Sequence, residues 1–175
     1  LMLEKILESD ITSAVSTVDL DNVFTDTYDV FLIKGYNIGS SSDGVLVQMR
    51  VRQEDGTLED TNAAYNTSRL FMNDFTNSVS RLERTDQTKF DITRTSIGTG
   101  ESEFCNFEVY VFNTRISSKT NIIINDVAQD SNADLKWGRG QGYHERTEII
   151  RGVQFFCSSG NLDNGKFCVY GFRKA

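Results

Sequence analysis

The 175-residue sequence contains no proline, one histidine and one tryptophan. A hydrolase triad needs a general base beside its nucleophile, and a zinc site needs several histidines or paired cysteines. The only histidine, His144, lies in the charged run Tyr143–Arg146, where we expect a solvated strand edge and not a catalytic base. No G-x-S-x-G motif or phosphate-binding loop occurs. The sequence therefore predicts a protein that is not an enzyme and that needs no cofactor or metal.

Long apolar runs and an excess of positive charge are also missing. No stretch of 18 apolar residues is present, so we expect no membrane-spanning helix and no membrane partner. The chain carries 25 acidic and 18 basic residues, which gives a formal net charge of −7 at pH 7. Nucleic-acid binding depends on lysine and arginine neutralising phosphates, so this chain is predicted to bind no nucleic acid.

Cysteine is scarce, and its three positions are Cys105, Cys157 and Cys168. All three lie inside apolar, strand-like runs, where a free thiol behaves as a small hydrophobic side chain. The odd number fits a protein assembled in a reducing cytoplasm. A bridge between Cys157 and Cys168 is the alternative to three free thiols.

The residues that are abundant, 12 Phe, 6 Tyr and 13 Gly, are typical of a β domain with glycine-based turns. The most distinctive segment is 149–173, in which two apolar runs, 149–157 and 167–172, flank the turn-forming linker 158–165. This pattern predicts a closing β-hairpin. Both runs carry apolar side chains on both faces, as in a strand inside a sandwich or under a neighbouring subunit.

Short strands are also predicted along the rest of the chain, with turns about every ten residues. Their segments are 14–20, 28–37, 45–52, 63–72, 88–95, 104–113 and 119–127. Residues 73–86 are expected to form a long loop with one helical turn at 79–82. Because no crossover helices are available for a parallel sheet, the predicted fold is all-β: an antiparallel two-sheet sandwich, jelly-roll-like.

The N-terminal segment follows a different period. Leu3, Ile6, Leu7 and Ile11 recur at spacings of three and four, which predicts a short amphipathic helix. Such a helix is too short to be stable alone, so its apolar side must dock on the domain's own sheet or on a neighbouring subunit. We therefore divide the chain into an N-terminal arm, 1–20, and a β-sandwich domain, 21–175.

Two segments carry candidate binding residues. Asp19 and Asp21, with Asp26 nearby, are either calcium ligands in a loop or, as we expect, a solvated acidic linker. The glycine-rich segment 134–143 is expected to be a loop, and its side chains suit glycan binding by stacking and hydrogen bonding. These candidate glycan-binding residues are Trp137, Arg139, Gln141 and Tyr143. The interpretation that we favour is that Trp137 packs at the end of the sandwich or in a subunit contact. A glycan site would be better supported by a second aromatic side chain on which a sugar ring could stack.

Three segments carry a resemblance to a known class of proteins: 28–38 (YDVFLIKGYNI), 107–113 (FEVYVFN) and 150–172, which ends in GVQFFCSSGNLDNGKFCVYGF. Their order and content resemble small virion structural proteins of tailed phages, especially phages of marine bacteria, including cyanobacterial phages. The resemblance covers most of the chain beyond residue 28 and implies a virion component with a β-sandwich. Similar domains occur as capsid decoration proteins and as tail-fibre modules, so the position on the particle stays open.

The resemblance and the apolar segments together predict a capsid decoration or cement protein that forms homo-oligomers and contacts the major capsid protein or other virion proteins. The residues expected at these interfaces are Leu3, Ile6, Leu7, Ile11, Tyr110, Phe112 and Phe156. The alternative is a tail-fibre or adhesin module that binds host-surface glycan. In both cases the expected location is the virion, capsid exterior or tail, assembled in the cytoplasm of the bacterial host.

Overall fold

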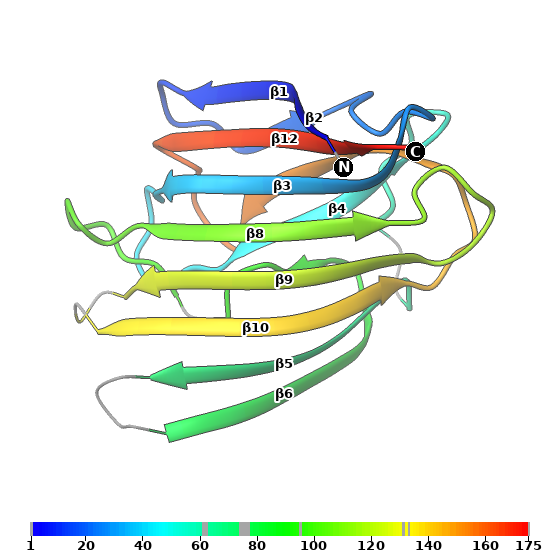
Figure 1. Cartoon of the computed structure of the whole chain (residues 1–175). Helices are drawn as coiled ribbons and strands as arrows, with labels where there is room; N and C mark the ends of the chain where they lie inside the picture. The colour runs from blue at the N-terminus through cyan, green and yellow to red at the C-terminus, as the bar shows by residue number, and fades with distance from the viewer. Residues whose placement is uncertain are drawn as a thin grey trace.

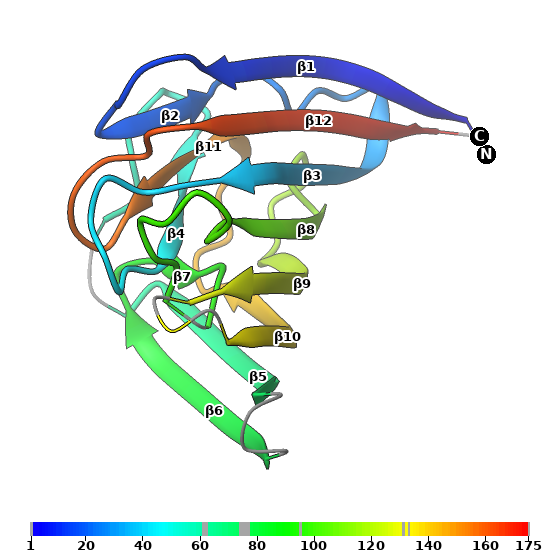
Figure 2. The ribbon, with the colours of Figure 1, turned by 90° about the vertical axis from the view of Figure 1, so that its left-hand side faces the viewer.

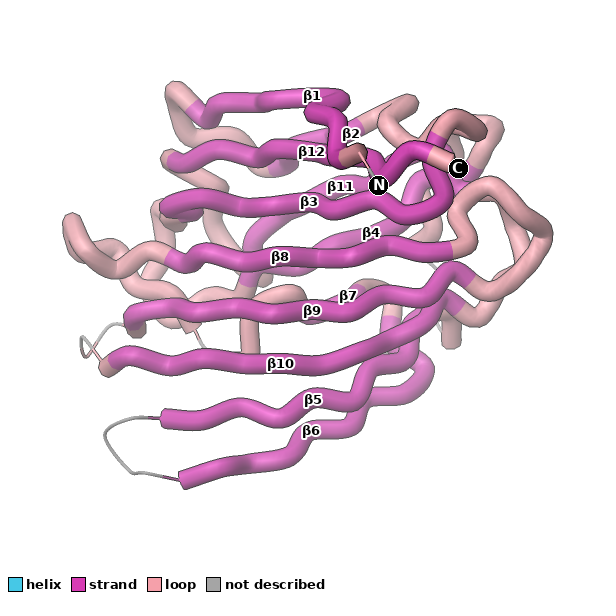
Figure 3. Tube along the Cα trace, viewed as in Figure 1, coloured by secondary structure: helices cyan, strands magenta, loops and turns pink. Residues whose placement is uncertain are grey.

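The structure is a computed structural model that describes residues 2–60, 63–73, 78–94, 96–130, 132 and 134–174. Within these ranges the regular elements are strands, and no helix is present that could cross a membrane (Figure 3). The strands are β1 (Leu3–Ile11), β2 (Thr17–Leu20), β3 (Tyr28–Ile38), β4 (Val47–Gln53), β5 (Tyr65–Asn73), β6 (Ser78–Gln87), β7 (Phe90–Asp91), β8 (Cys105–Phe112), β9 (Thr120–Gln129), β10 (Leu135–His144), β11 (Ile150–Cys157) and β12 (Gly165–Arg173).

The strands form two antiparallel sheets packed face to face (Figures 1 and 2). The large sheet has eight strands in the order β1-β12-β3-β8-β9-β10-β5-β6, and the small sheet has four in the order β2-β11-β4-β7. The chain passes repeatedly between them: β1 and β3 belong to the large sheet, whereas β2 and β4 belong to the small one. The predicted all-β, antiparallel, jelly-roll-like sandwich is confirmed.

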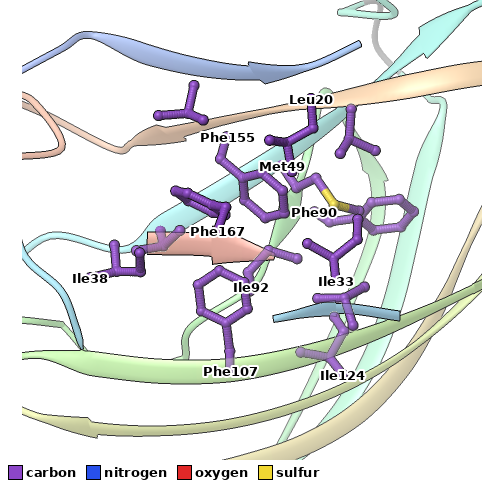
Figure 4. Close-up of a cluster of buried hydrophobic side chains, with 14 of the residues drawn as sticks. Leu20, Ile33, Ile38, Met49, Phe90, Ile92, Phe107, Ile124, Phe155 and Phe167 are labelled. Atoms are coloured by element: carbon purple, nitrogen blue, oxygen red, sulfur yellow. The ribbon is translucent and has the colours of Figure 1, made fainter. Parts of the chain in front are cut away.

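The core lies between the two sheets and follows from strict alternation along the strands. In β8 and β9 every second residue is buried, as the period of a strand with one covered face requires. Three aromatic rings meet at its centre: Phe107 of β8, Phe155 of β11 and Phe167 of β12 have centroids 4.7 to 5.9 Å apart (Figure 4). Burying each such side chain stabilises the fold by about 1.5–3 kcal/mol.

The predicted C-terminal hairpin is wrong. β11 pairs with β2 and β4 in the small sheet, and β12 pairs with β1 and β3 in the large one. The linker between them therefore crosses the sandwich, which is possible because packed sheets are only about 10 Å apart. Phe155 and Phe167 face each other across the core at 4.7 Å. The apolar character of both arms thus reflects packing between sheets and not a shared ladder.

The predicted N-terminal helix is also wrong, because residues 3–11 form the edge strand β1, paired with β12. A register shift between Lys5 and Leu7 interrupts the alternation there. Ile6 and Leu7 both pack against the core, and Ile11 is buried in it. This irregularity produces the spacing of three and four that resembles a helix. Residues 3–20 supply one strand to each sheet, so the strand pairing does not separate an arm, 1–20, from a domain, 21–175.

Two further predictions about local structure need correction. The expected loop with a helical turn over 73–86 contains strand β6, paired with β5, while its residues 74–77 lie outside the described residues. The expected strand over 88–95 is reduced to the two-residue β7, which pairs with β4. β6 is the last strand of the large sheet and carries four charged side chains, Arg81, Glu83, Arg84 and Asp86, a composition that suits an exposed edge.

A buried ion pair lies beneath β10, on the core side of the large sheet. Arg69 of β5 binds Asp126 of β9, and both side chains are almost fully buried. The Arg69 guanidinium also donates hydrogen bonds to the main-chain oxygens of Asp91 and Ile92, each at 2.8 Å. β10 runs between β5 and β9, and a Cβ on its Gly138 would lie 2.5 Å from Asp126 Oδ1. The glycine leaves the space that the ion pair occupies.

Candidate functional site

The face of the large sheet that points away from the small sheet, here called the outer face, is the candidate functional surface. Directly paired residues on neighbouring strands point to the same face of a sheet. Trp137 of β10 is opposite Val127 of β9 and Met72 of β5, and Met72 is opposite Val79 of β6. The pairing therefore places these four side chains in one row across the outer face.

Exposed hydrophobic side chains are concentrated on this face. In the described part of the chain, the large hydrophobic residues that are exposed are all on the outer face except Met2 and Ile116. The residues on the outer face are Leu3, Leu70, Val79, Ile123, Val127, Leu135, Trp137 and Tyr143. Single exposed hydrophobic residues are normal on a protein surface, but a concentration of them on one face marks a contact surface.

Five of these residues, together with the half-buried Met72, form what we call the apolar patch, at the end of the large sheet where β10 begins. Its members are Leu70, Met72, Val79, Val127, Leu135 and Trp137. Val79 is 63% exposed, Leu70 52% and Trp137 44%. When a partner covers such exposed apolar side chains, the complex is stabilised by about 25 cal/mol for each Å² of apolar surface removed from water.

A groove of about 610 Å³ lies on the outer face toward the other end of β10. It extends over β8, β9, β10, β5 and β6, and the lining residues that matter below are Ser68, Glu83, Phe112, Asn121, Gln141 and Tyr143. The pairing brings them together: Tyr143 is opposite Asn121, and Gln141 is opposite Ser68. The volume is within the range of about 300–1,000 Å³ that is typical of small-molecule sites.

The four candidate glycan-binding residues lie on a strand and not, as predicted, on a loop. Trp137, Arg139, Gln141 and Tyr143 alternate along β10 with residues that point inward, so all four side chains are exposed on the outer face. Gln141 and Tyr143 line the groove, whereas Trp137 belongs to the apolar patch. Tyr143 is six positions after Trp137 along the extended strand, a distance of about 20 Å. The predicted set is therefore divided between two ends of one strand.

The seven predicted interface residues are distributed over three environments. Leu3, Tyr110 and Phe112 are on the outer face. Ile6, Leu7 and Ile11 pack inward against the protein's own core. Phe156 lies on the exposed side of the small sheet, where the Arg50 guanidinium sits 4.7 Å from its ring centroid.

The prediction for His144 is wrong, because this residue is fully buried and not at a solvated edge. Its ring lies 5.0 Å from the ring of Tyr65. Burial lowers the pKa of His144 to about 4, with a smaller opposing effect from the Glu59 carboxylate. The imidazole is therefore neutral at physiological pH and is held in the core, away from the outer face.

The acidic side chains proposed as alternative calcium ligands are bound to arginines. Asp19 pairs with Arg52 at 2.5 Å, Asp21 with Arg151 at 2.7 Å and Asp26 with Arg115 at 3.3 Å. Across the described ranges no group of three or more His, Cys, Asp and Glu side chains is placed to hold a metal ion. The three cysteines are free and buried, so the alternative Cys157–Cys168 bridge is not formed, and burial raises the pKa of the Cys105 thiol.

The groove residues that the sequence analysis missed come from other strands. Ser68, Glu83 and Asn121 stand at exposed or half-buried positions of β5, β6 and β9. Alternation along β9 predicts that Asn121 points to the outer face, because its neighbour Ile122 points to the core. The residues that lie next to Asn121 on the neighbouring strands are set by the register of strand pairing. No local pattern in the sequence encodes this register.

Comparison with known proteins gives limited similarity. No family model matches the sequence, and no curated protein matches it. Among solved structures, the CBM40 of Ruminococcus gnavus IT-sialidase bound to α2,3-sialyllactose is 9% identical, with 98% of this chain and 95% of that chain covered and a TM-score of 0.34. A further structure of the same CBM40 gives 9% identity, coverage of 97% and 94%, and a TM-score of 0.33. A Clostridium perfringens endo-β-galactosidase that releases GlcNAcα1-4Gal is 10% identical, with 87% of this chain and 41% of that chain covered and a TM-score of 0.22. All these TM-scores are below 0.5, so the function of this chain has to be argued from its own residues.

Proposed function

We propose that this chain is a non-enzymatic structural protein of a virus particle, a capsid decoration or cement protein that is held in its assembly by the apolar patch. The observation that carries the proposal is the concentration of exposed hydrophobic side chains on the outer face of the large sheet. The resemblance of segments 28–38, 107–113 and 150–172 to virion proteins of tailed phages supports the choice of particle.

The patch suits a protein partner because it combines apolar area with a regular, hydrogen-bonded scaffold. Trp137 and Leu70 project from strands paired on both sides, so covering them orders little additional backbone. Aromatic residues at the centre of an interface contribute most to binding free energy. The proposed partners are a second copy of this chain and the major capsid protein.

The positions of the nucleophile and base candidates support a non-enzymatic role. His144 is buried beside Tyr65, and its pKa is lowered by burial, so it is unsuited to exchange protons with a substrate at the surface. The thiol of Cys105 is also buried, and burial raises its pKa. A thiol in this environment stays protonated and unreactive.

A charge placed in the apolar patch should disrupt assembly. We expect the double variant Leu70→Lys/Val79→Lys to weaken self-association, or association with shells of the major capsid protein, by at least about tenfold, because two ammonium groups would have to be desolvated. Sedimentation velocity of the purified chain and co-sedimentation with shells measure the two associations.

Ile116→Lys is the matched control, because Ile116 is as exposed as Leu70, at 54% and 52%, but is not on the outer face. It should leave both associations unchanged. A wild-type chain that stays monomeric and does not co-sediment would contradict the proposal, as would a double variant that behaves like wild type. Quantifying the chain in purified virions separates capsid from tail: a copy number comparable to that of the major capsid protein indicates decoration, and a much smaller one indicates a tail fibre.

A further inference from the structure

We propose that the groove at the Tyr143 end of β10 is a binding site for a neutral saccharide. This activity is independent of the apolar patch and goes beyond the structural role proposed above. The groove and the patch share the outer face but lie toward opposite ends of the same strand. β10 runs from left to right in Figure 1, from Leu135 beside the patch to His144 beside the groove.

The first argument is the supply of unused hydrogen-bonding groups. The side chains of Ser68, Asn121 and Gln141 line the groove and make no hydrogen bond to any described part of the chain. Each amide offers two N–H donors and a carbonyl acceptor, and the serine hydroxyl offers both functions. Since Gln141 is opposite Ser68 on the neighbouring strand, these groups converge on one region instead of pointing to separate areas of solvent.

The second argument is the apolar part of the lining. Phe112 and Tyr143 are both opposite Asn121, one on each side, so two aromatic side chains flank an amide in a single row across β8, β9 and β10. A sugar ring has C–H groups on its faces and hydroxyls at its edge. Aromatic rings suit the first and amides the second, and this mixture of apolar walls with a few converging polar groups is typical of small-ligand sites.

Charge selects between neutral and acidic sugars. The charged side chains in the lining are Glu83 and Arg84. Arg84 is engaged by Asp91 at 3.4 Å, whereas Glu83 has no ion-pair partner in the described ranges. Lys119, whose ammonium lies 4.9 Å from the ring centroid of Tyr143, is paired with Glu145 at 2.6 Å. The charge at the groove without an ion-pair partner is therefore the Glu83 carboxylate, which accepts hydrogen bonds from hydroxyls and repels a second carboxylate or a sulfate. The favoured ligand is a neutral hexose oligosaccharide and not a sialylated or sulfated one.

The test uses the full chain on an array of neutral glucose-, galactose- and mannose-based oligosaccharides, with sialylated and sulfated counterparts of each. We expect binding to one or more neutral glycans. Asn121→Ala/Gln141→Ala should weaken that binding by at least about tenfold, because two hydrogen-bonding side chains are lost. Arg139→Ala is the matched control: Arg139 is exposed on the same face of the same strand but outside the groove, and its loss should leave binding unchanged.

A second measurement locates the site independently of the variants. Backbone amide shifts recorded during titration with the best neutral glycan should change around Asn121, Gln141 and Tyr143 and not around Trp137. The proposal is overturned if no neutral glycan binds, if only acidic glycans bind, if the double variant binds as wild type does, if Arg139→Ala loses binding, or if the shift changes lie around Trp137 in the apolar patch. Leu70→Lys/Val79→Lys should keep glycan binding, so failure of the assembly proposal and failure of this one are distinguishable.

Discussion

At the scale of single residues, the buried His144 should make the free energy of unfolding depend on pH. In the fold, burial holds its pKa at about 4, whereas in the unfolded chain it titrates near its ordinary value of about 6.5. Between these values the unfolded chain binds more protons than the folded one, so the free energy of unfolding falls as the pH falls from 6.5 toward 4.

The expected loss between pH 7.5 and pH 5 is on the order of 2 kcal/mol from this one group. His144→Phe replaces the imidazole with a ring that does not titrate. The variant should lose most of that pH dependence, as measured by urea unfolding at the two pH values. The charged neighbours Glu59, Glu145 and Arg146 remain in the variant, so the difference between the two proteins isolates the histidine. Equal pH dependence in both would show that the imidazole is not the group responsible.

At the scale of elements, β10 contributes side chains to both proposed binding surfaces. Gly138, Gly140 and Gly142 point inward, where the first two make room for the Arg69–Asp126 ion pair. The residues that alternate with them point outward: Trp137 belongs to the patch, and Gln141 and Tyr143 line the groove. The glycines are thus required by what lies beneath the strand, while the outward residues are free to serve binding.

Gly140→Ala should therefore destabilise the fold. Its Cβ would lie 2.3 Å from Arg69 Cγ and 2.8 Å from the main-chain oxygen of Ser68, and Arg69 is fixed by its ion pair and hydrogen bonds. We expect the free energy of unfolding to fall by about 1–3 kcal/mol, the usual cost of overpacking. Gln141→Ala, one residue further along and exposed, should stay within about 0.5 kcal/mol of wild type in the same chemical denaturation. A Gly140→Ala protein as stable as wild type would contradict the close packing under β10.

The same strand shows what sequence patterns could and could not predict. Apolar residues at strand spacing correctly identified β3, β8 and β9, although β9 also turns the polar side chains of Thr120 and Asp126 inward. Glycine at every second position of 138–142 resembles a loop, since the reason for it, the side chain of Arg69, comes from a strand some 70 residues away in sequence. The sequence analysis therefore assigned the candidate residues of β10 to a loop, whereas they lie on a strand. Their true neighbours, Asn121 and Ser68, follow from register, which alternation does not fix.

The prediction of a C-terminal hairpin failed for a related reason. Two apolar arms joined by a glycine-containing linker are compatible with one ladder or with two facing sheets, and both arrangements bury Phe155 and Phe167. The choice depends on the partners offered by β2, β4, β1 and β3, none of which is local in sequence. The fold class was predictable because it follows from the two-residue period of side chains along each strand. The topology was not predictable, since it depends on which strands pair with each other.

At the scale of the whole molecule, the chain closes on itself: β1 pairs with β12, with Leu3 opposite Phe172 (Figure 1). Pairing between the two ends of a chain is among the slowest contacts to form, and domains dominated by such pairing fold in milliseconds to seconds. Slower phases of tens of seconds usually come from proline isomerisation in the unfolded chain. This sequence contains no proline, so that source is absent.

Refolding should therefore be independent of how long the chain has been unfolded. In a double-jump experiment, chains held in denaturant for seconds or for an hour should refold with the same rates and amplitudes. Glu101→Pro provides the matched control, because Glu101 is exposed and follows Gly100 in a turn closed by a 3.0 Å hydrogen bond from Glu103 N–H to the Gly100 carbonyl, a position where proline fits. This variant should gain a slow phase of about 10–30% amplitude that develops during the hour. A phase in the wild-type chain that grows with time in denaturant would show that another slow isomerisation, and not the pairing of distant strands, limits its folding.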